Sequence, residues 1–284
     1  MSYSYQVTKY LRTLRVPQSQ NERYALALGA TALLSSSLFF PAVYRDYKTF
    51  ISYGPGGVPS NLFGWLLVRL AFQPFSREML STRVYDERVT AGEGHSSNNE
   101  GFLTLEPHQA RDVEDRPVVG PHVVPQRQLS QVPDEAVMHV KNRRSVPLVR
   151  ASKQPPREVP ALMAEAHADG LFLADNIPAS GIAKQMKGEI AHLHTGRRAL
   201  CSYDPSPCRF LTGKKVIEAG WGQRHGFAGT SALKFLSFGT KPDIPAEFLL
   251  VYAPRDETEI ETFMQIMAAS VKFMTGREDV RLTI

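Results

Sequence analysis

The sequence is poor in cysteine and has no glycosylation signal. Only Cys201 and Cys208 occur among 284 residues, seven positions apart in a polar stretch. Two such residues exclude a disulfide framework, and their spacing matches no standard zinc motif. No Asn-x-Ser/Thr sequon is present, so one positive sign of a lumenal domain is missing.

Positive charge is in modest excess but is nowhere concentrated. The net charge is +5, and lysine and arginine are spread along the chain apart from short pairs such as Arg143-Arg144. The absence of a zinc finger, an RNP-type motif or a long basic run argues against nucleic acid as a partner. Anionic lipid headgroups are the partner that this excess favours. Apolar residues make up 43% of the chain, which is ordinary for a protein that buries a core.

Near the start, Tyr24 to Val43 form twenty residues without a charge. This is the length needed to cross a bilayer as a helix. Basic residues precede it, so the positive-inside rule places the short N-terminus in the cytosol. A cleaved signal peptide is the alternative, but the apolar run is long for one and no clear cleavage site follows. We expect an uncleaved signal-anchor in the endoplasmic reticulum or another endomembrane.

The composition predicts five regions and an α+β fold, in which one mixed α/β domain follows a single transmembrane helix. These are a basic segment (1–23), the transmembrane helix (24–43), a membrane-proximal segment (44–89), a flexible loop (90–115) and the main domain (116–284). Within the membrane-proximal segment, residues 62–72 are too short to span and contain Arg69; an interfacial helix and a buried helix are both open.

Several elements of the main domain are predicted from local pattern. Residues 170–174 and 247–252 favour buried strands, and helical spacing after Ser180 favours a helix that reaches Ile190. Short valine runs at 117–119 and 122–124 favour short strands, and Asp134 can begin a helix. The final helix is predicted to start after Asp256 and to bury one stripe of residues, namely Ile260, Phe263, Met264, Met267, Val271 and Met274.

Three histidines are the strongest candidates for chemistry. His192 and His194 form a His-x-His pair after Glu189, and His225 follows Arg224. If the pair is extended, both imidazoles point to one side, because side chains alternate along a strand. A metal site with Glu189 as ligand or orienting group, a metal-free site with a histidine base and Arg224 at an oxyanion, and a purely structural cluster all remain open.

Two further segments offer groups that could bind a flat ligand. Trp221 stands between two glycines and is either a packing anchor or a wall for an aromatic molecule. Tyr252 and Arg255 end the strand predicted at 247–252 and provide a phenol and a guanidinium. Arg255 could equally be a surface charge paired with Glu259.

Four segments resemble the fungal luciferases that oxidise 3-hydroxyhispidin and their non-luminous relatives. They are RDYKTFISYGP (45–55), EIAHLH (189–194), GWGQRH (220–225) and YAPR (252–255). A weaker similarity covers residues 116–128. The matching segments follow the family order from the anchor to the last helix, and the string GWGQRH is specific.

The resemblance implies an enzyme that needs O2 as co-substrate and no added cofactor. Luminous members add O2 to an electron-rich hydroxypyrone, pass through a cyclic peroxide and lose CO2. Such a site must deprotonate an enol, hold the anion and exclude water. The resemblance makes His192, His194 or His225 the base and Arg224 or Arg255 the anion partner. Trp221 and Tyr252 would stack on a small aromatic or pyrone-like substrate.

This chain also departs from the family pattern. Where the luciferases have a short apolar strand with a further histidine, residues 195–207 contain no histidine and show no strand alternation. Either part of the site is lost here or the coding sequence is misassigned over 195–208. A non-catalytic ligand-binding or scaffold relative at the membrane is therefore an alternative, and a metal-dependent enzyme built on the histidines is another.

Overall fold

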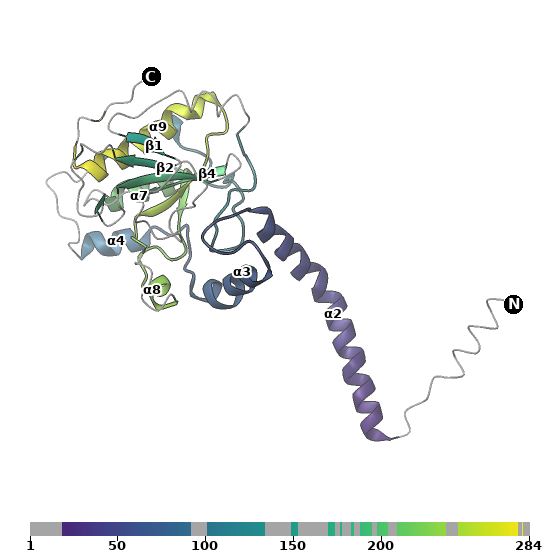
Figure 1. Cartoon of the computed structure of the whole chain (residues 1–284). Coiled ribbons are helices and arrows are strands. Elements are labelled where there is room, and N and C mark those ends of the chain that lie inside the picture. Colours follow the sequence, from purple (N-terminus) through teal and green to yellow (C-terminus); the bar gives the residue numbers. More distant parts are fainter. Residues whose placement is uncertain are drawn as a thin grey trace. The chain divides into compact units, whose positions relative to one another are not determined.

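The structure is a computed structural model that divides the chain into two compact units, Met1–Thr49 and Phe50–Ile284. It describes residues 19–91, 101–133, 149–152, 170–173, 177, 183–184, 188–194, 198–203, 209–236, 244–277 and 280. The predicted helix after Asp134 and residues 92–100 of the predicted loop (90–115) lie outside these residues. Figure 1 shows the elements of each unit.

The described part of the first unit is formed by helix α2 (Gln20–Ser52), whose last residues belong to the second unit. Alanine and leucine favour the helix, and large apolar side chains such as Leu28 and Leu38 stand exposed along it. Among the described residues it is the one helix long and apolar enough to cross a membrane, although a signal sequence near the N-terminus would have the same properties. Its 33 residues correspond to about 50 Å of helix.

The second unit is built around one antiparallel sheet of six strands in the order β1-β2-β3-β4-β6-β5. The strands are β1 (Val149–Ser152), β2 (Gly170–Leu173), β3 (Glu189–His194), β4 (Arg198–Tyr203), β5 (Gly222–Arg224) and β6 (Phe248–Val251). The helical elements are α3 (Leu62–Leu66), the π-helical η1 (Leu67–Phe72), the 3₁₀ turns η2 (Gln73–Phe75) and η3 (Pro107–Gln109), α4 (Arg83–Thr90), α7 (Arg209–Glu218), α8 (Ala232–Leu236) and α9 (Glu257–Thr275). Mixed α and β structure is confirmed.

Helix α9 begins and packs as its sequence predicts. Asp256 accepts hydrogen bonds from the backbone N–H groups of Thr258 and Glu259 at 2.9 and 3.2 Å, which satisfies two free donors of the first turn. All six residues of the predicted stripe are buried. The methionines therefore fill the core, as expected for this flexible side chain.

Two predicted strands are confirmed, because β2 and β6 occupy the segments predicted at 170–174 and 247–252. Three other local predictions are wrong. The helix predicted to reach Ile190 cannot do so, because Gly188 adopts a φ of +80° and the chain then turns into β3. The predicted lack of a strand after His194 is also wrong, since β4 is hydrogen-bonded to both β3 and β6 and pairing outweighs its weak alternation.

The valine runs near residue 120 do not form strands either. Among the described residues they provide one isolated bridge, Val119 to Gln128. Prolines at 117, 121 and 125 remove the backbone donors that a ladder needs.

Two glycines with positive φ allow a test of how tightly the turn after α7 is packed. Gly220 and Gly276 have φ of 75° and 68°, but a Cβ on Gly220 would lie 2.9 Å from the Arg111 carbonyl oxygen, whereas Gly276 has open space. We expect Gly276→Ala to lower the free energy of unfolding by about 1 kcal/mol and Gly220→Ala by about 3 kcal/mol. Chemical denaturation measures both, and equal losses would contradict this packing.

Candidate functional site

Strand β3 carries a bulge that brings Glu189 and His192 to the same face of the sheet. Three positions apart on a regular strand, these side chains would point to opposite faces. Here Gly170 of β2 pairs with His192, whereas Phe172 pairs with Glu189, so one extra residue of β3 is accommodated at Ile190. Because Gly170 and Phe172 share a face, their partners do as well. A β-bulge commonly redirects a side chain in this way.

The two side chains form a buried hydrogen-bonded pair. His192 Nδ1 lies 2.8 Å from Glu189 Oε1, and the two residues are 6% and 2% exposed. When the carboxylate accepts the Nδ1–H, it fixes the ring and places the basic lone pair on Nε2. A carboxylate that orients a histidine is the usual support for a histidine that moves protons.

The sheet register extends the face of His192 towards Tyr252. His192 pairs with Cys201, Cys201 with Leu250, and Leu250 with Gln223, so these four positions share one face. Tyr252 follows Leu250 by two residues, and its hydroxyl donates a hydrogen bond to Gln223 Oε1 at 3.0 Å. Burial raises the pKa of Tyr252, and Arg116 opposes this only in part. Tyr252 is therefore a neutral, buried hydrogen-bond donor at neutral pH.

The structure does not bring His225 to His192, and the expected single histidine cluster is wrong in this respect. His225 follows β5, and β4 and β6 lie between β5 and β3. Three strand spacings amount to about 14 Å, too far for one metal ion to bind both rings. His225 Nδ1 instead accepts a hydrogen bond from the Phe227 backbone at 3.1 Å.

A second register shift in β3 lies between Leu193 and His194. The side chain of His194 is outside the part of the chain that the structure describes, so its predicted role stays a prediction. Among the described residues, no three His, Cys, Asp or Glu side chains gather as metal ligands would.

Arg224 lies on the face of the sheet opposite to His192. It follows Gln223 on β5 and pairs with Leu249, so its side chain alternates away from the face of His192. It is 5% exposed, lies over the Tyr85 ring at 5.8 Å and donates to the Ala228 carbonyl. No described carboxylate pairs with it, and its Nε has no hydrogen-bond partner among described residues. Burial lowers the pKa of this guanidinium. One small substrate cannot touch both Arg224 and His192.

Trp221 is placed as a packing anchor. Its indole is 1% exposed, donates its N–H to the Gln109 carbonyl at 2.7 Å, and is covered by the Arg111 guanidinium at 3.8 Å. The Arg111 guanidinium thus covers one face of the indole ring and leaves no room there for a ligand. These contacts do not support the alternative in which Trp221 forms a wall for an aromatic ligand.

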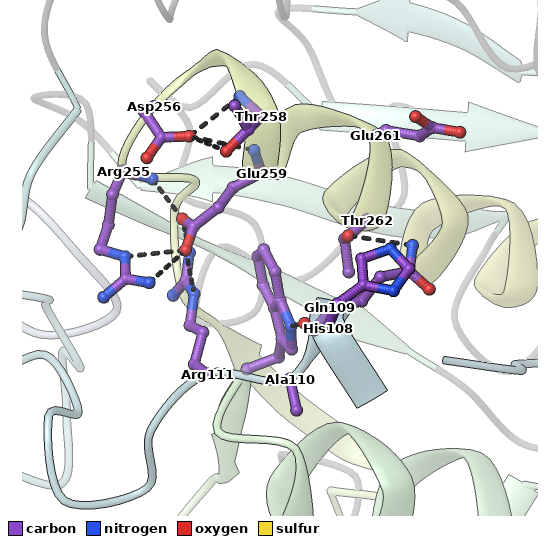
Figure 2. A pocket seen from close by; sticks show the side chains of 11 residues that line it. His108, Gln109, Ala110, Arg111, Arg255, Asp256, Thr258, Glu259, Glu261 and Thr262 are labelled. Atoms are coloured by element: carbon purple, nitrogen blue, oxygen red, sulfur yellow. Dashed lines mark hydrogen bonds and ion pairs between the residues drawn. The ribbon is translucent and has the colours of Figure 1, made fainter. Parts of the chain in front are cut away.

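Arg255 is paired with Glu259, which was the alternative to a role in ligand binding. Its Nε donates to Glu259 Oε1 at 2.8 Å, and its Nη1 lies 3.3 Å from Asp115. Glu259 also accepts from the buried Arg111, whose Nε is 3.1 Å from Oε1. Figure 2 shows Glu259 between the two guanidinium groups.

Arg111, Arg255 and Glu259, together with Trp221, line a pocket of about 280 Å³ at the start of α9. Its polar groups bond to one another: Glu259 to both arginines, Asp256 to Thr258, and Gln109 to Thr262 (Figure 2). A ligand here would have to break those bonds, so we assign the pocket a structural role.

Several buried polar residues escaped prediction because no pattern marks them. Gln128 is fully buried and accepts the backbone N–H of Ala253 at 3.0 Å. His122 bonds to Tyr53 at 3.0 Å, and Arg111 covers Trp221. Polar residues are normally exposed, so their burial becomes visible only with their partners. Gln223 was also missed, and its place inside the string GWGQRH was the one sequence feature that could have marked it as a site residue.

The pairing of Glu259 with buried Arg111 predicts a pH-dependent stability. Burial raises the pKa of Glu259, but hydrogen bonds from Arg255 and Arg111 outweigh it, so the net pKa lies below the ordinary 4.5. A lowered pKa stabilises the fold above the ordinary value, and this stability is lost as pH falls through the folded-state pKa. Glu259→Gln also leaves Arg111 buried without its charge partner, which costs about 3 kcal/mol at neutral pH.

The measurement is the free energy of unfolding of both proteins as a function of pH. The difference in the free energy of unfolding between wild type and Glu259→Gln should be largest at neutral pH and should decrease in acid. Glu257→Gln, an exposed residue in the same helical turn, should change little. A gap that is independent of pH would contradict this account.

Comparison with known proteins identifies the family. A model of the luciferase domain matches residues 187–270, which run from the turn before β3 into α9. The chain is 30% identical over 271 residues to luciferases of Armillaria ostoyae and Armillaria mellea, covering 90% of each chain. It is 28% identical over 265 residues to the luciferase of Neonothopanus nambi, covering 89% of this chain and 88% of that one. No solved structure matches it significantly. The matched segment contains the Glu189–His192 pair, the string GWGQRH and the capped start of helix α9. The chain is a member of the fungal luciferase family.

Proposed function

We propose that this protein is a membrane-anchored oxidoreductase that uses O2 and no added cofactor. Its substrate is a small aromatic or pyrone-like metabolite of the 3-hydroxyhispidin type. Family membership supports an oxygen-dependent reaction, because the relatives are luciferases. The buried Glu189–His192 pair in the family-matched segment is the observation on which the assignment of the site depends.

His192 acts as the general base in this proposal. Its Nε2 takes the proton of the substrate enol, while Glu189 holds Nδ1–H and stabilises the imidazolium that forms. The enolate is then electron-rich enough to react with O2 at a ring carbon. Closure to a cyclic peroxide and loss of CO2 complete the sequence that the family resemblance implies.

The rest of the same sheet face supplies orientation and protection from water. The Tyr252 hydroxyl and the Gln223 amide are buried on it and bonded to each other, and in this proposal they exchange that bond for hydrogen bonds to the oxygens of a pyrone. Leu250 is fully buried on the same face, where it pairs with Gln223 of β5 on one side and with β4 on the other. Its side chain makes this part of the face apolar. A dry surface of this kind protects a peroxide from hydrolysis.

The helix α2 would anchor the enzyme in the membrane, with lipid as its second partner. Its exposed apolar side chains fit a hydrocarbon environment. An endomembrane location is part of the proposal, because flat aromatic metabolites partition into bilayers.

A non-catalytic relative that binds a similar ligand is the second candidate. One observation favours it: β4 occupies the position of the family's strand but carries no histidine. The activity assay separates the two candidates, since a binding protein would retain the ligand without consuming oxygen.

The test is an assay of the purified full chain in detergent with 3-hydroxyhispidin, recording photons and dissolved oxygen together. We expect oxygen uptake to fall by about 10²–10⁴-fold in His192→Ala, the usual contribution of a general base. Glu189→Gln should lose about tenfold, because the ring loses its charged support.

The matched control is His108→Ala, which changes an exposed histidine on η3 and should leave the rate unchanged. Full oxygen uptake in His192→Ala would remove His192 from the site. No uptake by the folded wild type would instead favour the binding protein or a different substrate.

A further inference from the structure

A row of large apolar side chains stands exposed on the second unit, apart from helix α2. Leu70 and Phe235 are each 73% exposed and Phe63 is 67% exposed. Leu62, Leu66 and Phe75 are also exposed. We call these six residues the docking face. Large apolar side chains that gather exposed on neighbouring elements mark a contact with a partner or a membrane.

The docking face is one side of an amphipathic helical run. α3, η1 and η2 follow one another without a break from Leu62 to Phe75, and Leu62, Leu66 and Leu70 recur every four residues. The opposite side is buried and holds Gly64, Val68 and Phe72. A Cβ at Gly64 would lie only 1.8 Å from the Pro59 carbonyl oxygen, so the inner side is pressed against the protein.

Helix α8 extends the docking face. The rings of Phe75 and Phe235 lie 6.5 Å apart, which joins the end of the helical run to α8. Figure 1 shows α3 and α8 on the same side of the second unit. Two elements far apart in sequence therefore contribute exposed aromatic and aliphatic side chains to one surface.

The charged residues that lie next to the docking face in the sequence are positive. Arg69 and Arg77 lie within or directly after the helical run, and Lys234 precedes Phe235. No acidic residue occurs from Ser60 to Arg77 or from Ser231 to Leu236. Glu78, the next acidic residue, accepts hydrogen bonds from the backbone of Leu80 and Ser81. Apolar residues with a basic border suit anionic lipid headgroups.

We propose that the docking face rests on the bilayer surface that α2 crosses, with its apolar side chains at the level of the headgroups. This inference depends on the membrane anchorage proposed above. Leu62 lies nineteen positions after Val43, so the chain path between the apolar span and the face is at most about 45 Å. Tethering at this range raises the effective lipid concentration, and a surface of modest affinity then suffices.

Trp65 provides a native probe of this contact. It lies on α3 next to Leu66 and is partly buried, whereas Trp221, the second tryptophan, is 1% exposed in the core. The full chain is reconstituted into phosphatidylcholine–phosphatidylserine vesicles with or without brominated chains, which quench only nearby tryptophan. We expect brominated lipid to lower the Trp65 emission by about twofold. In Trp65→Phe the remaining Trp221 emission should not respond.

A paired substitution tests the docking face itself. Phe63→Ser with Leu70→Ser should abolish the quenching while α2 keeps the chain in the vesicles. The control is Val113→Ser, since Val113 is 49% exposed among Asp112, Glu114 and Asp115 and should keep full quenching. Each variant is also made in the Trp65→Phe background, where unchanged Trp221 emission shows that the core is intact.

The outcomes separate the docking face from the anchor. A chain bound to vesicles with an unquenched Trp65 would overturn the docking face alone. A chain that stays in the supernatant would overturn the anchorage and the docking face with it. Shielding of Trp65 from acrylamide that depends on protein concentration and not on lipid would show that a second copy covers the face, which also overturns the proposal.

Discussion

The extra residue of β3 at Ile190 is the constraint on which the proposed chemistry depends. Without it, Glu189 and His192 would lie on opposite faces of the sheet, and neither could support the other. The bulge is held in place because β3 is an inner strand, hydrogen-bonded to β2 on one side and β4 on the other. A buried carboxylate beside a histidine is costly to desolvate unless the two are bonded, so a rigid sheet suits this pair better than a loop.

The buried Arg111 guanidinium links segments that are far apart in the sequence to the sheet. Arg111 covers Trp221, bonds to Glu259 and donates to the Ala253 carbonyl at 2.9 Å. One guanidinium thereby joins the segment after η3, the turn before β5, the end of β6 and the start of α9. The same contacts occupy Trp221 and Arg255, which explains why two residues that the sequence offers for ligand binding serve the fold instead. The function proposed above therefore assigns the substrate to the face shared by His192, Leu250, Gln223 and Tyr252.

Local pattern predicted elements that depend on their own residues, and it failed where pairing decides the outcome. The Asp256 cap and the methionine stripe define α9 by themselves, and β6 is apolar throughout. By contrast, β4 has no clear alternation and becomes a strand because β3 and β6 flank it. The sequence analysis offered the three histidines as members of one site, but strand order puts β4 and β6 between His192 and His225. The sequence could identify His192 and Glu189, whereas only the register could show that the bulge makes them a pair.

The most direct test of the central claim is a double-mutant cycle on Glu189 and His192, read out as the rate of oxygen uptake with 3-hydroxyhispidin. If the two side chains act as one unit, the double variant should be no slower than His192→Ala alone, because Glu189 acts only through the ring that this variant removes. Multiplied losses in the double variant would contradict the account. They would mean that Glu189 and His192 contribute separately and that the bulge serves the fold alone.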